Sequence, residues 1–382
     1  MDMYAGLDGL RAIAFLMVFL LHADNFGIGW AGVQLFFVLS GFLITGILLD
    51  LKKKFSRKDY FIKFYGRRFL RIFPLYYFYL FAMLALTVGL EHLNFAVPQM
   101  ELFHAQFPFA VSYVYNFFWM TSTNLSIFLS HFWSLCIEEQ FYIVWPLLIF
   151  LVPEKQMKTL FLAAIAGGLL FRLGFTIAYQ IHPFSFVMRG AWYGIYALPF
   201  SHIDAFGLGA YLSKYQIPKA DKQLAVFMIL VPLAGYLSQF LSTGSIGSVD
   251  AFGYPFFMKD GFQFIWGYSL LDYLFVLIIS AVIRGGAFWE FLSWKPLAFL
   301  GKISYGLYVY HLAVTWFVPR LLTGILTGQS LWTKILLTVV EFFVTLLISV
   351  LSYFLLEKPV LSLKDQFFAV RSGNAASISK RS

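Results

Sequence analysis

The sequence predicts an all-α integral membrane protein that crosses the bilayer about ten times. The 382 residues are 60% apolar, their mean hydropathy is +0.76, and only 12% of them are charged, whereas soluble domains carry about 25% charged residues. No soluble fold can bury that proportion of hydrocarbon. Apolar runs of about 20 residues, the length of a membrane-spanning helix, recur along almost the whole chain.

Ten apolar windows, separated by polar residues or by glycine and proline, define the expected helices. The first window is too long for the core of a signal peptide and lacks a short basic leader, so we expect a retained helix. The ten predicted spans cover residues 7–28, 31–50, 68–90, 133–152, 157–180, 190–212, 223–241, 262–283, 303–323 and 332–356.

Basic residues set the expected orientation. They gather between the spans, above all at residues 51–67, and basic loops of this kind stay in the cytoplasm. With this loop inside, both termini are cytoplasmic, and 21 Lys and Arg residues lie on the inner side. Only four are expected on the outer side, namely Arg189, Lys259, Arg320 and Lys334. Orientation in the plasma membrane therefore accounts for the net charge of +9, and no nucleic-acid partner is expected.

The chain is expected to form one transmembrane domain over residues 1–360. Residues 361–382 read as a short, polar, basic, weakly ordered cytoplasmic tail. Two longer segments, 91–132 and 242–261, are expected outside. No internal repeat is visible, which disfavours the inverted repeats that are common in secondary transporters.

Ionisable residues within the spans are few, and each costs at least ~2.5 kcal/mol near the membrane centre. In the first span, Arg11 and His22 are eleven residues apart, which places them on the same side of a helix and roughly 16.5 Å apart along it. They are therefore candidates for a functional pair that faces the bundle interior. Alternatively, Arg11 reaches the inner headgroups and His22 bonds to a neighbouring helix.

The fourth span carries two adjacent carboxylates near its outer end, Glu138 and Glu139. Counted from the outer surface, Glu138 and His22 lie at similar depths, so a carboxylate and an imidazole can meet there. Adjacent helical positions point about 100° apart, and we therefore expect only Glu138 to face the site. Pairing of Glu139 with a lysine or an arginine is the structural alternative.

Three arginines, Arg67, Arg68 and Arg71, open the third span from the inner side. Their spacing at a helix N-terminus suits a phosphate-bearing ligand from the cytosol, although arginines beside a span more often anchor the helix at lipid headgroups. Cys136 is the single cysteine and reads as a packing residue, so we expect neither a disulfide framework nor a metal site. Other inward-facing candidates, each also explained by an ordinary interhelical hydrogen bond, are His202, Asp204, Asp272, Tyr305, Tyr308, His311 and Glu341.

Five ordered blocks together resemble the acyltransferase-3 family of membrane-bound acyltransferases, and they spread over about 360 residues. Such a match is far more specific than any single block. The blocks are an opening block (LDGLRA at 7–12, His22 and GVQLFFVLSGFLI at 32–44), an arginine motif (RRFLRIFP at 67–74), a glutamate motif (FWSLCIEEQFY at 132–142) and two closing motifs (SYGLYVYH at 304–311 and EKP at 357–359).

The resemblance implies a ten-helix domain that transfers an acyl group, usually acetyl from acetyl-CoA or another acyl-CoA, to hydroxyls of surface carbohydrate such as lipopolysaccharide. It implies that Arg11 and His22 are essential. Some relatives carry an appended extracytoplasmic hydrolase-like domain, which the segment after Leu356 is not expected to form. An outer partner would be needed for any further transfer. Donor binding is assigned to Arg67, Arg68, Arg71, Tyr305 and His311.

The expected mechanism uses His22, uncharged when buried, as the base that takes the hydroxyl proton. Glu138 is expected to orient the imidazole. The phosphates of acyl-CoA would bind the inner arginines while the thioester reaches His22. Two positions depart from the family pattern, because Gln34 and Cys136 stand where relatives often carry Asp and Ser. The competing classes are a transporter or flippase for a glycan or a lipid-linked precursor, which also uses buried charges, and a non-catalytic membrane subunit.

Overall fold

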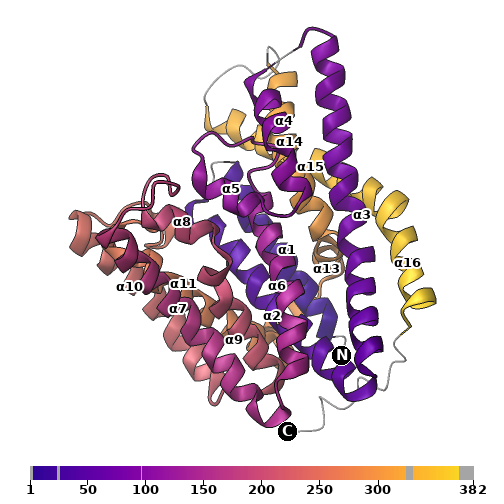
Figure 1. Ribbon diagram of the computed structural model, residues 1–382. Helices are drawn as coiled ribbons and strands as arrows, with labels where there is room; N and C mark the ends of the chain where they lie inside the picture. The colour runs from indigo at the N-terminus through magenta and orange to yellow at the C-terminus, as the bar shows by residue number, and fades with distance from the viewer. Residues whose placement is uncertain (1–2, 24–25, 96, 324–329, 370–382) are drawn as a thin grey trace.

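The computed structural model describes residues 3–23, 26–95, 97–323 and 330–369. These residues form helices and connecting loops, with no strand among them (Figure 1). The α-helices are α1 Met3–His22, α2 Ala31–Lys54, α3 Arg57–His92, α4 Pro98–Val111, α5 Tyr115–Thr121, α6 Phe132–Leu151, α7 Met157–Ile181, α8 Ala191–Ala197, α9 Ile203–Lys214, α10 Ala220–Thr243, α11 Gln263–Arg284, α12 Ala287–Leu292, α13 Lys295–Lys302, α14 Ser304–Leu321, α15 Leu331–Ser352 and α16 Lys358–Phe367.

The expected all-α membrane architecture is confirmed, with one difference in the count of spans. Among the described residues, eight segments are long and apolar enough to cross a membrane, or nine if α13 and α14, which meet at 74°, form one bent span. The predicted span 190–212 is broken into α8, a 3-10 turn at Pro199–His202 and α9. Pro199 has no N–H to donate, and Leu198 before it is extended, so a continuous helix cannot form there.

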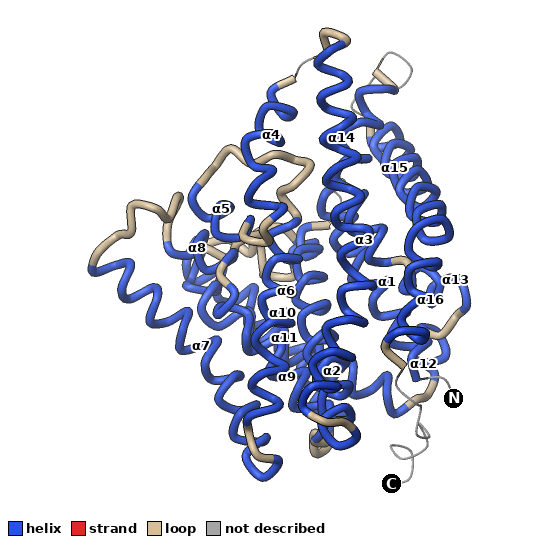
Figure 2. Tube along the Cα trace, turned by 45° about the vertical axis from the view of Figure 1, so that its right-hand side comes forward, coloured by secondary structure: helices blue, strands red, loops and turns tan. Residues whose placement is uncertain are grey.

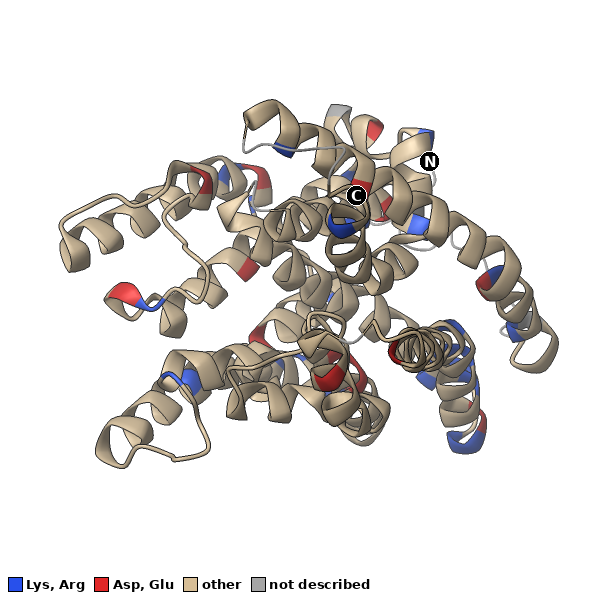
Figure 3. Ribbon diagram, turned by 90° about the horizontal axis from the view of Figure 1, so that it is seen from above, with Lys and Arg blue, Asp and Glu red and all other residues tan. Residues whose placement is uncertain are grey.

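The two ends of the bundle differ in charge. The basic end is where α2 stops at Lys54 and α3 starts at Arg57. Ser56 caps α3 there, because its Oγ accepts a hydrogen bond from the N–H of Asp59. The opposite end is where α3 reaches His92 (Figure 1). Seen from above, most of the ribbon is tan, and the lysines, arginines, aspartates and glutamates take up only a small part of it (Figure 3).

The long helix α3 and the predicted outer segment 91–132 build the opposite end. At 36 residues, α3 is about 54 Å long and exceeds the roughly 30 Å thickness of a bilayer core. Its last turns run beside α4 (Figure 2). The predicted loop therefore contains two helices, α4 and α5, and the helical part of the predicted tail is α16. The rest of that tail, residues 370–382, lies outside the described residues.

The centre of the bundle is made by α1, α2 and α9, with α7, α10 and α11 on one side and α14, α15 and α16 on the other (Figures 1 and 2). Helices α2 and α9 pack most extensively. Glycines allow this approach, because a Cβ built on Gly41 would lie 2.2 Å from the carbonyl oxygen of Phe206. Small residues at crossing points are how membrane helices pack closely.

A buried ion pair fixes α7 to α9. The Arg172 and Asp204 side chains are fully buried, and the Arg172 Nη2 lies 2.7 Å from the Asp204 Oδ2. The second guanidinium nitrogen lies 3.0 Å from Oδ1, which makes the pair bidentate. Asp204, one of the inward-facing candidates, is therefore engaged in an interhelical contact.

Candidate active site

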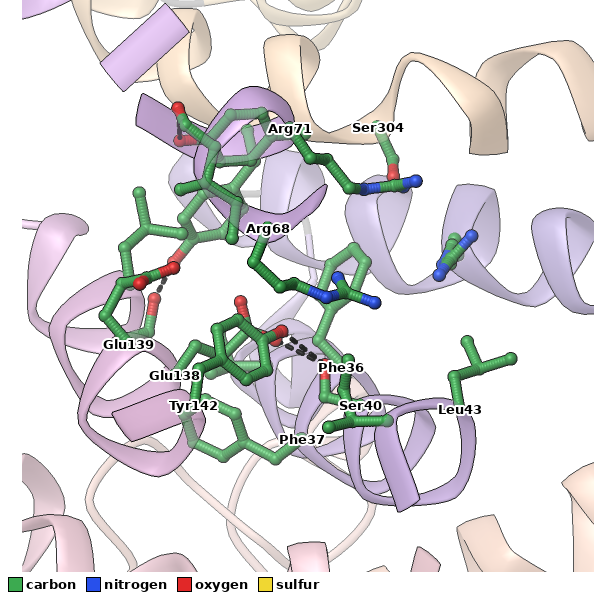
Figure 4. A pocket seen from close by; sticks show the side chains of 18 residues that line it. Phe36, Phe37, Ser40, Leu43, Arg68, Arg71, Glu138, Glu139, Tyr142 and Ser304 are labelled. Atoms are coloured by element: carbon green, nitrogen blue, oxygen red, sulfur yellow. Dashed lines mark hydrogen bonds between the residues drawn. The ribbon is translucent and has the colours of Figure 1, made fainter. Parts of the chain in front are cut away.

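A cavity of about 850 Å³, part of it open space, lies between α1, α2, α3, α6 and α14. We call it the arginine cavity, because Arg11, Arg68 and Arg71 all line it. Figure 4 shows the side chains of Arg68 and Arg71 pointing into this space from α3. Ser304 and Tyr305 line it from the start of α14. The structure thus brings two of the three arginines predicted for phosphate binding, Arg68 and Arg71, together with Arg11.

The three arginines differ in whether a nearby group balances the positive charge of the guanidinium. Arg11 forms an ion pair with Asp8 at 2.8 Å. Arg68 lies over the ring of Tyr142 at 5.4 Å, and neither Arg68 nor Arg71 makes a hydrogen bond or ion pair with another described residue. A cation without such a partner inside an apolar bundle is costly. The cavity therefore suits an anionic ligand.

Arg67 lies outside this cavity, contrary to its predicted role in donor binding. Its Nη1 donates a hydrogen bond of 3.1 Å to the carbonyl oxygen of Phe368, just beyond α16. Arg67 and Arg68 are neighbours on α3, so their side chains leave the helix about 100° apart. Arg71 leaves the helix between these two directions, so the cavity takes the Arg68 side of α3 and Arg67 lies on the side of α16.

Both glutamates of α6 line the arginine cavity, so the expectation that only Glu138 faces the site is wrong. Glu138 Oε1 accepts a hydrogen bond of 2.5 Å from Ser40 Oγ, and the Tyr142 hydroxyl lies 3.3 Å from the same Oγ (Figure 4). Glu139 is 9% exposed and its Oε1 has no hydrogen-bond partner. The cavity wraps around α6 far enough to reach two adjacent positions.

The arginine cavity is bounded toward the opposite end by Ser134 and Tyr308. Their hydroxyl oxygens lie 2.6 Å apart, and the Tyr308 hydroxyl donates to the carbonyl oxygen of His131 at 3.2 Å. Neither Ser134 nor Ser40 was singled out from the sequence, although both stand inside the glutamate and opening motifs. One turn beyond Tyr308 on α14 is His311.

His22 bonds to His311 rather than to a carboxylate. The His311 Nε2 and the His22 Nδ1 are 3.1 Å apart, and the His311 Nδ1 lies 2.6 Å from the carbonyl oxygen of Tyr308. A carbonyl only accepts, so His311 Nδ1 carries the proton. When both rings are neutral, His311 Nε2 accepts from His22 Nδ1–H, which leaves His22 Nε2 unprotonated. This tautomer can act as a base. The His22 ring also hydrogen-bonds to the backbone of Val18.

The predicted contact between Glu138 and His22 is wrong, and the start of α6 explains why. The segment before α6 turns into the protein interior, where Phe128 and Leu129 are fully buried. The His131 ring lies 5.1 Å from that of His311, at the depth of His22. Glu138 follows seven residues later, about 10.5 Å further toward the basic end. The expectation assumed that this helix starts at the membrane surface.

His22 lines a second cavity, also of about 850 Å³, between α1, α14 and α15. We call it the opposite cavity. Glu341 of α15 lines this cavity together with His22. His22 does not line the arginine cavity, so it shares no cavity with Glu138 or Glu139. His311 was predicted to bind the donor, but it lines neither cavity and instead contacts His22. Tyr305 does line the arginine cavity, and its hydroxyl donates to the Ile72 carbonyl at 3.0 Å.

No set of three His, Cys, Asp or Glu side chains in the described ranges is arranged to hold a metal ion. The polar groups of the two cavities are arginines, carboxylates, hydroxyls and imidazoles. Such a set can bind an anion at one end and move a proton at the other.

Comparison with known proteins gives a consistent set of relatives. A family described as an acyltransferase domain matches residues 4–354. The O-acetyltransferase OatA of Staphylococcus aureus is 29% identical over 371 residues, the peptidoglycan O-acetyltransferase OatA of Listeria monocytogenes is 29% identical over 369 residues, and the putative peptidoglycan O-acetyltransferase YrhL of Bacillus subtilis is 30% identical over 382 residues. Each alignment covers 93% of this chain and 54% to 57% of the relative. No solved structure matches.

Proposed function

Because this chain belongs to the acyltransferase-3 family of membrane acyltransferases, we propose that it transfers an acetyl group from acyl-CoA to a hydroxyl of cell-wall carbohydrate. The family membership and the O-acetyltransferase relatives support O-acetylation by a multi-pass membrane protein. The chain spans little more than half of those relatives, so donor, acceptor and mechanism are proposals for this chain. Two relatives are named for peptidoglycan, which favours peptidoglycan over lipopolysaccharide as acceptor.

The observation that carries the proposal is the pair of unpaired guanidinium groups, Arg68 and Arg71, in the arginine cavity. Coenzyme A carries several phosphate charges, and arginine binds phosphate through bidentate, charge-assisted hydrogen bonds. The cavity lies on the basic-end side of His22, and the excess of lysine and arginine at that end favours a cytosolic location. The donor can therefore bind without crossing the membrane.

The thioester must then reach His22. Arg11 and His22 are eleven positions apart on α1, which is roughly 16.5 Å along the helix and the scale of an extended pantetheine arm. The hydrogen bond between Ser134 and Tyr308 closes the cavity before His311. We infer that this contact opens when the donor is bound, so that the acetyl carbonyl meets an acceptor hydroxyl beside His22.

The transfer step is proposed as follows. The acceptor oxygen attacks the thioester carbonyl carbon while His22 Nε2 takes the hydroxyl proton. The tetrahedral intermediate collapses with cleavage of the carbon–sulfur bond, and the proton passes to the leaving thiolate. The products are the O-acetyl ester and free coenzyme A. His311 is a positioning residue in this scheme, because its Nε2 holds His22 in the tautomer that leaves Nε2 unprotonated.

Two cavities separated by a thin polar layer would also suit a transporter or flippase. The two classes differ in whether a covalent change occurs. Purified protein in lipid nanodiscs, given radiolabelled acetyl-CoA and a soluble muropeptide, should produce labelled muropeptide. Release of the muropeptide across a vesicle membrane without acetylation would favour the transporter.

The arginine variants test the donor site. Replacing Arg68 and Arg71 together by glutamine should raise KM for acetyl-CoA by at least tenfold, since each charge-assisted hydrogen bond contributes about 1.5–3 kcal/mol. Arg67→Gln is the matched control, because it removes a neighbouring guanidinium that faces α16, and it should leave KM unchanged. If the double variant and Arg67→Gln raised KM for acetyl-CoA by the same factor, the arginines would be assigned to membrane anchoring. His22→Ala should abolish transfer in protein that still binds acetyl-CoA.

A further inference from the structure

We propose that the opposite cavity binds the acceptor, and that Arg320 and Lys334 at its mouth select a saccharide that carries an acidic group. This inference rests on the proposed acetyl transfer and names the acceptor site. The cavity is enclosed by the ends of α1 and α14 and the first half of α15. It is the cavity that contains His22, the proposed base.

The floor of the opposite cavity carries a carboxylate without a protein partner. Glu341 is 4% exposed, and its carboxylate makes no hydrogen bond or ion pair with another described residue. Most of α15 faces outward, and its buried positions are all polar: Glu341, Thr345 and Ser349. A buried carboxylate left unpaired in an apolar bundle is costly. A ligand hydroxyl that donates to Glu341 would remove that cost.

Two cations line the same cavity nearer its mouth. Arg320 stands over the Trp316 ring at 4.0 Å, and its Nη1 donates to the Trp316 carbonyl oxygen at 2.7 Å. These contacts hold the guanidinium in place and leave other N–H donors free. Lys334 projects from the second turn of α15 and is exposed. No described acidic side chain pairs with either cation within 4 Å.

These cations are unusual for the side of the protein on which they lie. Of the 28 lysines and arginines of the chain, the orientation argument places only four on the outer side. Two of those four, Arg320 and Lys334, line this one cavity. Orientation alone disfavours positive charge on that side, so their joint presence beside a cavity points to an anionic ligand.

The spacing of the charges limits the ligand. Lys334 and Glu341 are seven residues apart on α15, which is about 10.5 Å along the helix. The reacting hydroxyl of the saccharide would lie at the level of Glu341 and His22. Its carboxylate or phosphate would lie at the level of the cations, which is a distance of about one or two sugar rings. The chemistry that fits is an acidic saccharide, with the reacting hydroxyl inward and the acidic group toward the mouth.

The test compares two acceptors that differ only in charge. The probes are a disaccharide of N-acetylglucosamine and N-acetylmuramic acid with a free lactyl carboxylate, and the same disaccharide as its methylamide. Purified protein in nanodiscs with acetyl-CoA should show a KM at least tenfold lower for the acidic probe, as expected of a charge-assisted hydrogen bond. The double variant Arg320→Gln/Lys334→Gln should lose this preference and keep its KM for acetyl-CoA.

The matched control is Arg189→Gln/Lys259→Gln, which removes the same charge from the same expected side but not from the cavity. It should keep the preference for the acidic probe. Equal use of the two probes by the unmodified protein, or a preference that survives in the cavity variant, would overturn the proposal. If neither probe nor a whole muropeptide is acetylated, the proposed function itself fails. Glu341→Gln should raise KM for both probes without changing KM for acetyl-CoA, which a purely structural role would not produce.

Discussion

Removing the imidazole of His311 tests how His22 is prepared as a base. In the structure His311 Nε2 lies 3.1 Å from His22 Nδ1, and the Tyr308 carbonyl fixes which His311 nitrogen carries the proton. His311→Leu removes the side-chain acceptor for His22 Nδ1–H and leaves the backbone hydrogen bond to Val18 as the remaining contact of the imidazole. The proton can then also occupy Nε2, where it blocks proton abstraction. General-base catalysis contributes about 10²- to 10⁴-fold, so we expect kcat to fall by at least 100-fold, about 2.7 kcal/mol in activation free energy.

The assay is acetyl transfer by purified protein, with KM for acetyl-CoA measured in parallel. Since His311 does not line the arginine cavity, KM for acetyl-CoA should not change. His311→Gln retains a side-chain acceptor and should recover part of the lost kcat. His131→Leu is the matched control, because it deletes a buried imidazole of the same group that bonds to the Val309 carbonyl and not to His22. A His311→Leu protein with ordinary kcat would refute the tautomer argument.

Two further predictions concern stability. Asp204→Ala leaves the buried Arg172 guanidinium without its bidentate carboxylate and with only the oxygens of Ile265, Ser201 and Ser269 as hydrogen-bond partners. Breaking a buried pair costs about 3–5 kcal/mol, so the thermal unfolding temperature in detergent should fall; an unchanged melting temperature would show that the pair contributes little. Gly41→Ala places a methyl group 2.2 Å from the Phe206 carbonyl and should also lower that temperature by forcing α2 and α9 apart, whereas Gly46→Ala on the same helix meets nothing within 4 Å and should not.

Local sequence patterns were sufficient to predict the membrane helices. Each predicted span matches a helix or a broken pair of helices, because length and hydropathy are properties of the chain itself. The break at Pro199 has a visible cause, since proline cannot donate within a helix. A window of mean hydropathy over residues 190–212 averages across that proline and therefore shows one continuous span.

The candidate site was predictable only in part. The arginine cluster at the helix N-terminus predicted a site for an anion, and the structure puts Arg68 and Arg71, but not Arg67, in one cavity with Arg11. The partner of His22 could not be found in this way. It depends on how deep α6 starts, and that depth is set by the burial of Phe128 and Leu129, a tertiary contact that leaves no periodic pattern in the sequence.

The central claim is that the donor binds on one side of the membrane and the acceptor is modified on the other. Proteoliposomes of determined protein orientation, with muropeptide enclosed and acetyl-CoA added outside, test this most directly. Vesicles in which the α2–α3 loop faces outward should acetylate the enclosed muropeptide, and vesicles of the reverse orientation should not. Equal acetylation in both orientations, or acetylation only when donor and acceptor share one side, would contradict the account.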